Sequence, residues 1–510
     1  MGLEQKAVEG FRFEDDQNHY EFDHPQDECG VLGLYMPGAN IGGVAYEALM
    51  RQQHRGQSGA GIAYTIGDQL IVHKGKGRID VAIPEISPLF SPNGFSTLED
   101  SLTAVGHTRY STDENDDAFQ PLLDYKRRIA VSLNGQVQLA HEIAERSFGV
   151  DRSKSISDSD SIKEMISSRM DKGDDALAAL HAVLPTLEGS YCLTLTDGKR
   201  LIAARDPWGT HPLSLAKLKD DKGYVVASET AAFKFVDTEY ERDIVEGEIV
   251  VIDEDGVHSS FIDRVEEPKH CMFEYIYFAK PTSEVNGVYM YAARKAMGKY
   301  LAIDHDVDVD IVVGVPNSGM AAAAGFAEQS SRLKVDGLIK DDFVGRTFIE
   351  RELMRALALM RKFDVNVLEV AGKKIALVDD SVIKGNTTRE TIAMLRKAGA
   401  KEIHVLSAAP RYANPCYGGM DTRDISSLIA AHYDDEGIAR EIDADSIRFN
   451  SVERVKQAIN DGRVRDLQRD IGRQICDACH TGNYPYAVTP EDLDLLAAAG
   501  SGQELALYQA

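Results

Sequence analysis

The sequence predicts two halves of different class: an α+β half with antiparallel sheets, followed by an α/β half with a parallel sheet. Two observations carry this prediction. Up to about residue 260 the chain alternates short apolar strands with glycine turns, which is typical of antiparallel hairpins packed against helices. From about residue 285 the order becomes strand, loop and helix, which is typical of buried parallel strands.

Composition supports a globular protein and excludes several function classes. The chain has 510 residues, 43% of them hydrophobic and 27% charged, which are ordinary globular values. A net charge of −26 disfavours binding to nucleic acid or to an anionic membrane. No apolar run approaches the about 20 residues of a membrane-spanning helix. The acidic first 28 residues have no signal-peptide core, so we expect a cytoplasmic location.

The first half contains strands at Gly30 to Tyr35 and Ile129 to Leu133, and two hairpins that turn at Gly67-Asp68 and Asp197-Gly198. Helical patterns interrupt these strands at about 43–53, 159–171 and 174–184. The polar stretch at about 254–270 is the predicted boundary between the halves.

The second half twice repeats a strand followed by a loop and a helix. Ile311 to Val315 leads into Pro316-Asn317-Ser318-Gly319 and an alanine-rich helix, and Ile375 to Val378 leads into a helix that ends near Gly399. A buried parallel sheet follows from this alternation.

The segment 375–388 predicts a phosphate and ribose site. Asp379 and Asp380 end a buried strand, where open α/β sheets bind ligands, and carboxylates suit a ribose diol. Gly385, Thr387 and Thr388 lead into a helix N-terminus, whose N–H groups and dipole favour a phosphate. The alternative is a strand that ends in solvated acids, followed by a threonine-capped helix.

The full pattern from 375 to 388 resembles the binding motif of the type I phosphoribosyltransferases. That resemblance implies phosphoribosyl pyrophosphate (PRPP) as substrate and Mg²⁺ as cofactor. It implies that Asp379 and Asp380 contact the ribose, that Ser318 belongs to the pyrophosphate loop, and that Lys340 begins the mobile loop that binds PRPP. The residues that it assigns to the 5′-phosphate are Lys384, Gly385, Asn386, Thr387 and Thr388.

Cys29 alone reads as a cysteine buried in a strand. The motifs that follow it are His54 to Gln57, His107 to Thr112, Asn134-Gly135, Ser159 to Ser161 and Arg205 to Pro207. In this order they resemble the glutamine amidotransferases with an N-terminal nucleophile, which implies a four-layer αββα domain.

This resemblance makes Cys29 the catalytic nucleophile. Its α-amine, with a pKa near ~8, serves as the base. Arg109 is then expected to bind the α-carboxylate of glutamine, Asp160 its α-ammonium group, and Asn134 and Gly135 the oxyanion. The mechanism requires removal of residues 1–28. The alternative is a tail that stays attached and leaves the glutaminase inactive.

Four cysteines, Cys271, Cys416, Cys476 and Cys479, lie in contexts that suggest a metal site. Cys476 and Cys479 have the spacing of zinc and iron–sulfur ligands. The four contexts resemble the iron–sulfur branch of one enzyme family, which implies a structural 4Fe-4S cluster. Structural zinc is the competing interpretation.

Together the halves resemble the amidophosphoribosyltransferases, which make 5-phosphoribosylamine from glutamine and PRPP in purine biosynthesis. The resemblance implies a homotetramer inhibited by purine nucleotides. The loops expected to bind PRPP depart from the family's usual sequence. The alternative is therefore a regulator that binds PRPP or nucleotides without turnover, and a hexosamine-6-phosphate synthase ranks lower. The predicted divisions are a propeptide at 1–28, a glutaminase domain at 29–262, a phosphoribosyltransferase domain at 263–485 and a tail at 486–510.

Overall fold

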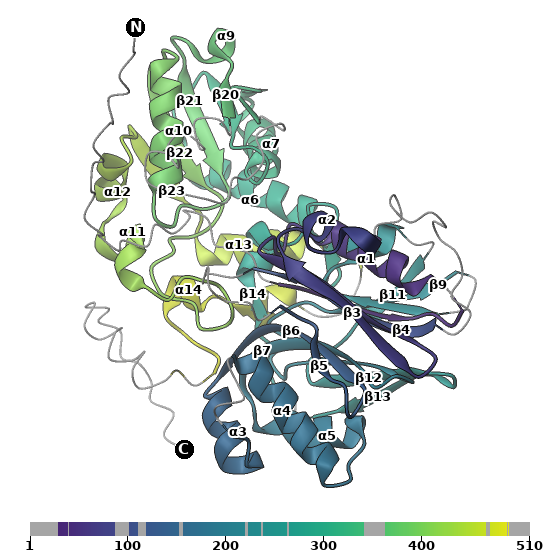
Figure 1. Ribbon diagram of the computed structural model, residues 1–510. Helices are drawn as coiled ribbons and strands as arrows, with labels where there is room; N and C mark the ends of the chain where they lie inside the picture. The colour runs from purple at the N-terminus through teal and green to yellow at the C-terminus, as the bar shows by residue number, and fades with distance from the viewer. Residues whose placement is uncertain are drawn as a thin grey trace, which may run out of the picture.

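The computed structural model describes residues 29–38, 40–86, 101–110, 119–151, 157–219, 223–235, 238–262, 265–340, 363–465, 470–486 and 488. The predicted propeptide, most of the predicted tail and the segment after Lys340 lie outside these residues. Figure 1 shows the antiparallel half and the parallel half side by side.

The first half contains two antiparallel sheets. The larger has the strand order β11-β9-β10-β1-β4-β2-β3, and the smaller has the order β13-β12-β8-β7-β6-β5. The strands of the larger sheet are β1 (Gly30–Tyr35), β2 (Gly59–Ile66), β3 (Gln69–Lys76), β4 (Ser101–Arg109), β9 (Ser214–Leu218), β10 (Tyr224–Ala227) and β11 (Thr238–Asp243). The strands of the smaller sheet are β5 (Leu122–Asp124), β6 (Ile129–Gln138), β7 (Glu188–Thr196), β8 (Leu201–Arg205), β12 (Glu248–Asp253) and β13 (Gly256–Phe261).

Helices cover the outer faces of both sheets, and this confirms the predicted four layers (Figure 1). The larger sheet packs against α1 (Ile41–Arg51) and α2 (Ile79–Ala82), and the smaller against α3 (Ala140–Phe148), α4 (Asp158–Asp171) and α5 (Ala176–Val183). Cys192 is fully buried between the sheets. Helix α1 begins two residues before the predicted position because Asn40 caps it, accepting a hydrogen bond from the Gly43 N–H at 3.1 Å.

The second half is built on a parallel sheet of order β18-β17-β21-β22-β23. Alternate residues of its strands enter two cores on opposite faces, as in Val312 on one face and Val313 on the other. The strands are β17 (Ile311–Gly314), β18 (Leu333–Val335), β21 (Lys374–Asp379), β22 (Glu402–Ser407) and β23 (Ser446–Phe449). Shorter pairs are β14 (His270–Cys271) with β24 (Ile475–Cys476), β15 (Glu284–Val285) with β16 (Val288–Tyr289), and β19 (Leu338–Lys340) with β20 (Phe363–Val365).

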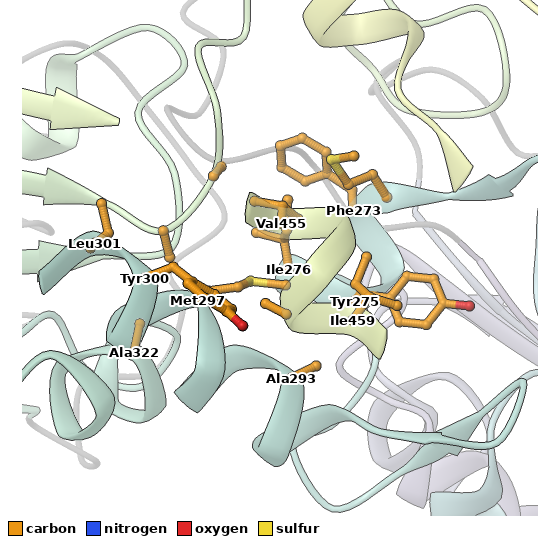
Figure 2. Close-up of a cluster of buried hydrophobic side chains, with 14 of the residues drawn as sticks. Phe273, Tyr275, Ile276, Ala293, Met297, Tyr300, Leu301, Ala322, Val455 and Ile459 are labelled. Carbon is orange, nitrogen blue, oxygen red and sulfur yellow. The ribbon is translucent and has the colours of Figure 1, made fainter. Parts of the chain in front are cut away.

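Helices also cover both faces of the parallel sheet. One core joins α6 (Met290–Asp304), α7 (Met320–Ser330) and α13 (Val452–Asp461) to the segment 272–279. Figure 2 shows this cluster, with Met297, Ala322 and Val455 among its members. The other face carries α9 (Val367–Val370), α10 (Asn386–Lys397), α11 (Ile429–His432) and α12 (Asp435–Glu441), and α14 (Ala478–Thr481) follows β24.

The polar stretch predicted as a boundary contains a strand. β13 lies at the edge of the smaller sheet with much of its surface exposed. An edge strand with solvated side chains has the composition of a linker, so polarity alone does not separate the two.

Candidate active sites

Cys29 opens onto a cavity of about 380 Å³ at the start of β1. Its wall combines distant segments of the first half with one segment of the second half. The lining residues are Cys29, Arg109, Tyr110, Gln120, Leu122, Leu133, Asn134, Gly135, Gln136, Ser157, Asp158, Ser159, Gly419, Met420, Asp421 and Arg423. Of the predicted glutaminase residues, the structure therefore brings Cys29, Arg109, Asn134 and Gly135 together.

Asn134 and Gly135 lie on β6 with the features of oxyanion donors. The Asn134 side chain is buried, and its Nδ2 has no hydrogen-bond partner among the described residues. Gly135 has φ +132°, and a Cβ there would lie 2.1 Å from the Ser190 carbonyl oxygen. Only glycine fits this position. A buried, unpaired amide at a cavity wall is a donor ready for an oxyanion.

Arg109 ends β4 and is held there by its backbone. Its carbonyl accepts a hydrogen bond from the Ser58 N–H at 2.9 Å. A Cβ at Gly56 would lie 2.4 Å from the Arg109 carbonyl carbon, so this loop packs directly on the Arg109 backbone. Such packing fixes the backbone position from which the Arg109 side chain extends.

Two acidic residues line the cavity, Asp158 and Asp421, and the predicted Asp160 is not among the lining residues. Asp158 accepts hydrogen bonds from the N–H groups of Val137 at 3.2 Å and Ser159 at 2.8 Å. Burial raises the Asp158 pKa, opposed by these bonds and by the charges of His141 and Arg423. Asp160 instead accepts a hydrogen bond from the Ser157 hydroxyl at 3.2 Å. The alternating acids at 158 and 160 hid this difference from sequence reasoning.

The second half supplies part of the glutaminase wall, which the sequence analysis missed. Gln138 Nε2 donates a hydrogen bond to the Tyr417 carbonyl at 3.0 Å, and His211 Nε2 lies 2.9 Å from the Gly418 carbonyl oxygen. Gly419, Met420, Asp421 and Arg423 then line the cavity. The only signal available was their position directly after Cys416, in a motif assigned to the metal site.

A buried ion-pair network also joins the halves. Arg55 donates two hydrogen bonds to Glu274, at 2.9 and 2.7 Å, and a third to Glu229 at 3.1 Å. Glu229 further accepts from the Lys280 N–H at 2.8 Å and the Ser283 hydroxyl at 2.6 Å. Burial acts to raise the pKa of Glu229, but His54 and Arg55 hold it well below its usual range.

In the second half, the two predicted ligand loops lie side by side because β17 and β21 are neighbours in the sheet. A Cβ at Gly319 would lie 2.4 Å from the Val378 carbonyl oxygen. Ser318 is partly exposed beside this contact. Asp379 and Asp380 are buried, and Asp380 Oδ1 has no hydrogen-bond partner among the described residues. An unsatisfied buried carboxylate oxygen fits a hydroxyl donor or a cation.

The loop after these acids ends at the N-terminus of α10. Gly385 precedes the helix with φ +85°, a conformation that favours glycine. Thr387 and Thr388 are buried in the first turn, whereas Lys384 is partly exposed and Asn386 is exposed. Lys340 is exposed at the end of β19, where the first described stretch of the second half ends.

The four predicted metal ligands line one small cavity of about 20 Å³. Cys271 and Cys476 are paired in register on β14 and β24. Burial raises the pKa of Cys476 to about 12 and raises that of Cys479 as well. Thiolates here would need a bound cation to offset this cost.

Three tyrosines, Tyr417, Tyr484 and Tyr486, also line this cavity. The chain's single tryptophan, Trp208, packs against the cluster formed by Tyr417 and Tyr486. The described residues contain no group of three or more His, Cys, Asp or Glu side chains arranged for a single metal ion. Four cysteine thiols are also a donor set that structural zinc uses. A four-iron cluster, with one thiolate per iron, fits the donor set.

Within the described residues, no helix combines the length and apolar character needed to span a membrane.

Comparisons with known proteins find related sequences that cover most of the chain. A family model described as a glutamine amidotransferase domain matches residues 107–235. The amidophosphoribosyltransferase of Synechococcus elongatus is 36% identical to the chain over 482 residues, covering 92% of this chain and 94% of that protein. The amidophosphoribosyltransferase of Bacillus subtilis is 36% identical, covering 90% of this chain and 94% of that protein.

Solved structures extend the likeness to the fold. The glutamine PRPP amidotransferase from B. subtilis, complexed with ADP and GMP, matches with a TM-score of 0.80 at 34% identity. The match covers 91% of this chain and 98% of the B. subtilis chain. A structure described as the allosteric regulatory enzyme of purine biosynthesis matches with the same score and identity.

Proposed function

Because the chain belongs to the amidophosphoribosyltransferase family, we propose that its two sites act in sequence on glutamine and PRPP. The products are glutamate, 5-phosphoribosylamine and pyrophosphate, in the first step of purine biosynthesis. The observation that carries the proposal is the pairing of two sites in one chain. One is a Cys29 cavity with an unpaired buried Asn134 amide, and the other is the buried Asp379-Asp380 pair at a parallel sheet edge.

In the first site, Cys29 Sγ attacks the side-chain carbonyl carbon of glutamine. The α-amine of Cys29 accepts the thiol proton and passes it to the leaving ammonia. Asn134 Nδ2 and the Gly135 N–H donate to the oxyanion of the tetrahedral intermediate. Water then cleaves the thioester and releases glutamate.

Two charged side chains orient this substrate. Arg109 binds the α-carboxylate through its planar guanidinium. The position of Asp158 in the cavity wall supports it, rather than Asp160, as the partner of the α-ammonium group.

In the second site, Asp379 and Asp380 accept hydrogen bonds from the ribose hydroxyls. Lys384, Gly385, Asn386, Thr387 and Thr388 hold the 5′-phosphate at the N-terminus of α10, Ser318 meets the pyrophosphate, and Lys340 adds positive charge. Ammonia attacks the ribose C1 as the bond from C1 to pyrophosphate oxygen breaks, and the nitrogen then loses a proton. Bound Mg²⁺ would neutralise the leaving pyrophosphate, and the unpaired Asp380 oxygen fits such a cation.

We propose that Cys271, Cys416, Cys476 and Cys479 hold a 4Fe-4S cluster, supported by their convergence on one cavity. The cluster would supply structural cross-linking between β14, β24 and the segment around Cys416. We also propose that residues 1–28 are removed as a propeptide, since an attached chain would convert the Cys29 amine into an amide.

We further propose that the protein forms a homotetramer, that purine nucleotides inhibit it and that it is located in the cytoplasm. The B. subtilis relative, complexed with ADP and GMP, supports the binding of purine nucleotides by this chain.

The test uses full-length chain purified without oxygen, with its N-terminus, iron and acid-labile sulfide measured. We expect an N-terminus at Cys29 and about four irons per chain, the content of a single cluster. We also expect PRPP-dependent product from glutamine. Asp380→Asn should slow product formation from either glutamine or ammonium by about 10- to 100-fold. Binding of PRPP without product, and with residues 1–28 still attached, would support the regulator alternative instead.

A further inference from the structure

Met420 lies in the wall shared by the two cavities. Its side chain is 2% exposed, and it lines both the four-cysteine cavity and the Cys29 cavity. The segment 416–423 begins with a predicted cluster ligand and ends with Arg423, beside Asp158. One short stretch of chain therefore forms part of both sites.

The middle of this segment is fixed to the glutaminase half. The Gly418 carbonyl lies within hydrogen-bond distance of both His211 Nε2 and the Ser190 hydroxyl. A Cβ at Gly419, where φ is +129°, would lie 3.2 Å from the His211 ring and 3.8 Å from the Gly135 Cα. The segment thus passes against the strand that carries the oxyanion donors.

The beginning of the segment is tied to the cysteine cavity. The Gly418 N–H donates to Cys416 Sγ at 3.3 Å, and the Cys416 N–H donates to the Thr422 carbonyl at 3.4 Å. The Thr422 hydroxyl lies 2.5 Å from the Tyr412 hydroxyl. These bonds close 416–422 into a turn, so a displacement of Cys416 carries Met420 with it.

We propose that Met420 couples the two cavities: the group bound by the four cysteines holds the segment 416–423 in the position that completes the glutamine cavity. This inference rests on the proposed function, which assigns a cluster to one cavity and glutamine to the other. Met420 is a positioning residue, since it acts through the wall rather than on reacting atoms. Coupling between sites is reciprocal, so a ligand in the glutamine cavity must also stabilise the cluster.

The test measures cluster loss directly. Full-length chain is purified without oxygen, and half is treated with a diazoketone analogue of glutamine that alkylates Cys29. Both samples are exposed to air, and the visible absorbance of the cluster is followed. We expect alkylation to slow the loss by about fivefold or more. Met420→Ala should abolish this protection and raise the KM for glutamine more than it lowers kcat, and Met420→Leu, of similar volume, should restore both.

A second variant addresses the tie to the glutaminase half without changing either cavity wall. Gln138→Leu removes the bond to the Tyr417 carbonyl and should weaken the protection in the same assay. Equal rates of cluster loss with and without alkylation in the unmodified sequence would overturn the inference, as would full protection in Met420→Ala. Absence of iron and sulfide would overturn the inference because no cluster would be present. Failure of the analogue to label Cys29 would overturn it because the cavity would not be a glutamine site, so the two measurements identify which part of the proposed function failed.

Discussion

The two proposed catalytic sites differ in how far along the chain their parts are spread. The proposed ribose and phosphate site lies mostly within Asp379 to Thr388, on one strand, one loop and one helix. The glutamine cavity collects its wall from Cys29, β4, β5, β6, the start of α4 and, in the other half, Gly419, Met420, Asp421 and Arg423. We therefore expect the local site to tolerate changes elsewhere in the fold, whereas the glutamine cavity depends on how the two halves meet.

The sharpest test of this separation is Cys29→Ala. Loss of the nucleophile should lower glutamine-dependent product formation by at least about 10⁴-fold, while ammonium still supports the reaction at the second site. Parallel assays with the two nitrogen donors measure the effect. Cys192→Ala, which removes a thiol buried between the sheets, serves as the matched control. Glutamine-dependent turnover that survives in Cys29→Ala would contradict the mechanism.

Asn134→Ala tests whether the unpaired amide is an oxyanion donor. Loss of one such donor costs about 10²- to 10³-fold in kcat, with a smaller change in KM because the donor acts mainly on the transition state. Glutaminase kinetics in the presence of PRPP provide the measurement. A variant whose kcat is intact and whose KM alone rises would show that Asn134 binds glutamine in its ground state.

A matched pair, Asp158→Asn and Asp160→Asn, distinguishes the structure from the sequence prediction. Losing a charged hydrogen bond to the substrate ammonium costs about 10-fold or more in KM, and we expect it for Asp158→Asn. Asp160→Asn should change KM by no more than about twofold, because its carboxylate bonds to Ser157 at the start of α4. The reverse order of effects would restore Asp160 as the ligand.

The smallest expected effect concerns the junction between the halves at acid pH. The folded pKa of Glu229 is depressed, so its stabilisation is complete above the ordinary glutamate pKa of about 4.3. That stabilisation is lost as the pH falls through the folded pKa. Denaturant unfolding, measured from neutral pH to below about 4.3, should show the free energy of unfolding decline. The Glu229→Gln variant should have a lower free energy of unfolding at neutral pH, and this free energy should fall less steeply as the pH is lowered. An unchanged slope would assign the pH dependence to other acids such as Glu246.

Sequence reasoning found the local features and missed the long-range ones. The motif from 375 to 388 was recognisable because consecutive residues carry strand, acids, loop and helix. Asn134 and Gly135, the predicted oxyanion donors, reach the cavity wall together because they are adjacent on β6. The choice between Asp158 and Asp160 depends on which way the first turn of α4 faces, and the contribution of 419–423 depends on contacts between residues more than 200 positions apart, such as Gln138 with Tyr417. Neither is encoded in neighbouring letters.

The position of Trp208 gives the molecule an internal optical probe. It is the only indole in the chain, and it packs against the aromatic cluster that contains Tyr417 and Tyr486 beside the four-cysteine cavity. Energy transfer to a coloured group in that cavity would quench the indole emission, and departure of the group would restore it. Tryptophan fluorescence lifetime therefore reports the state of one defined location, without a dye and without background from any second emitter of the same kind.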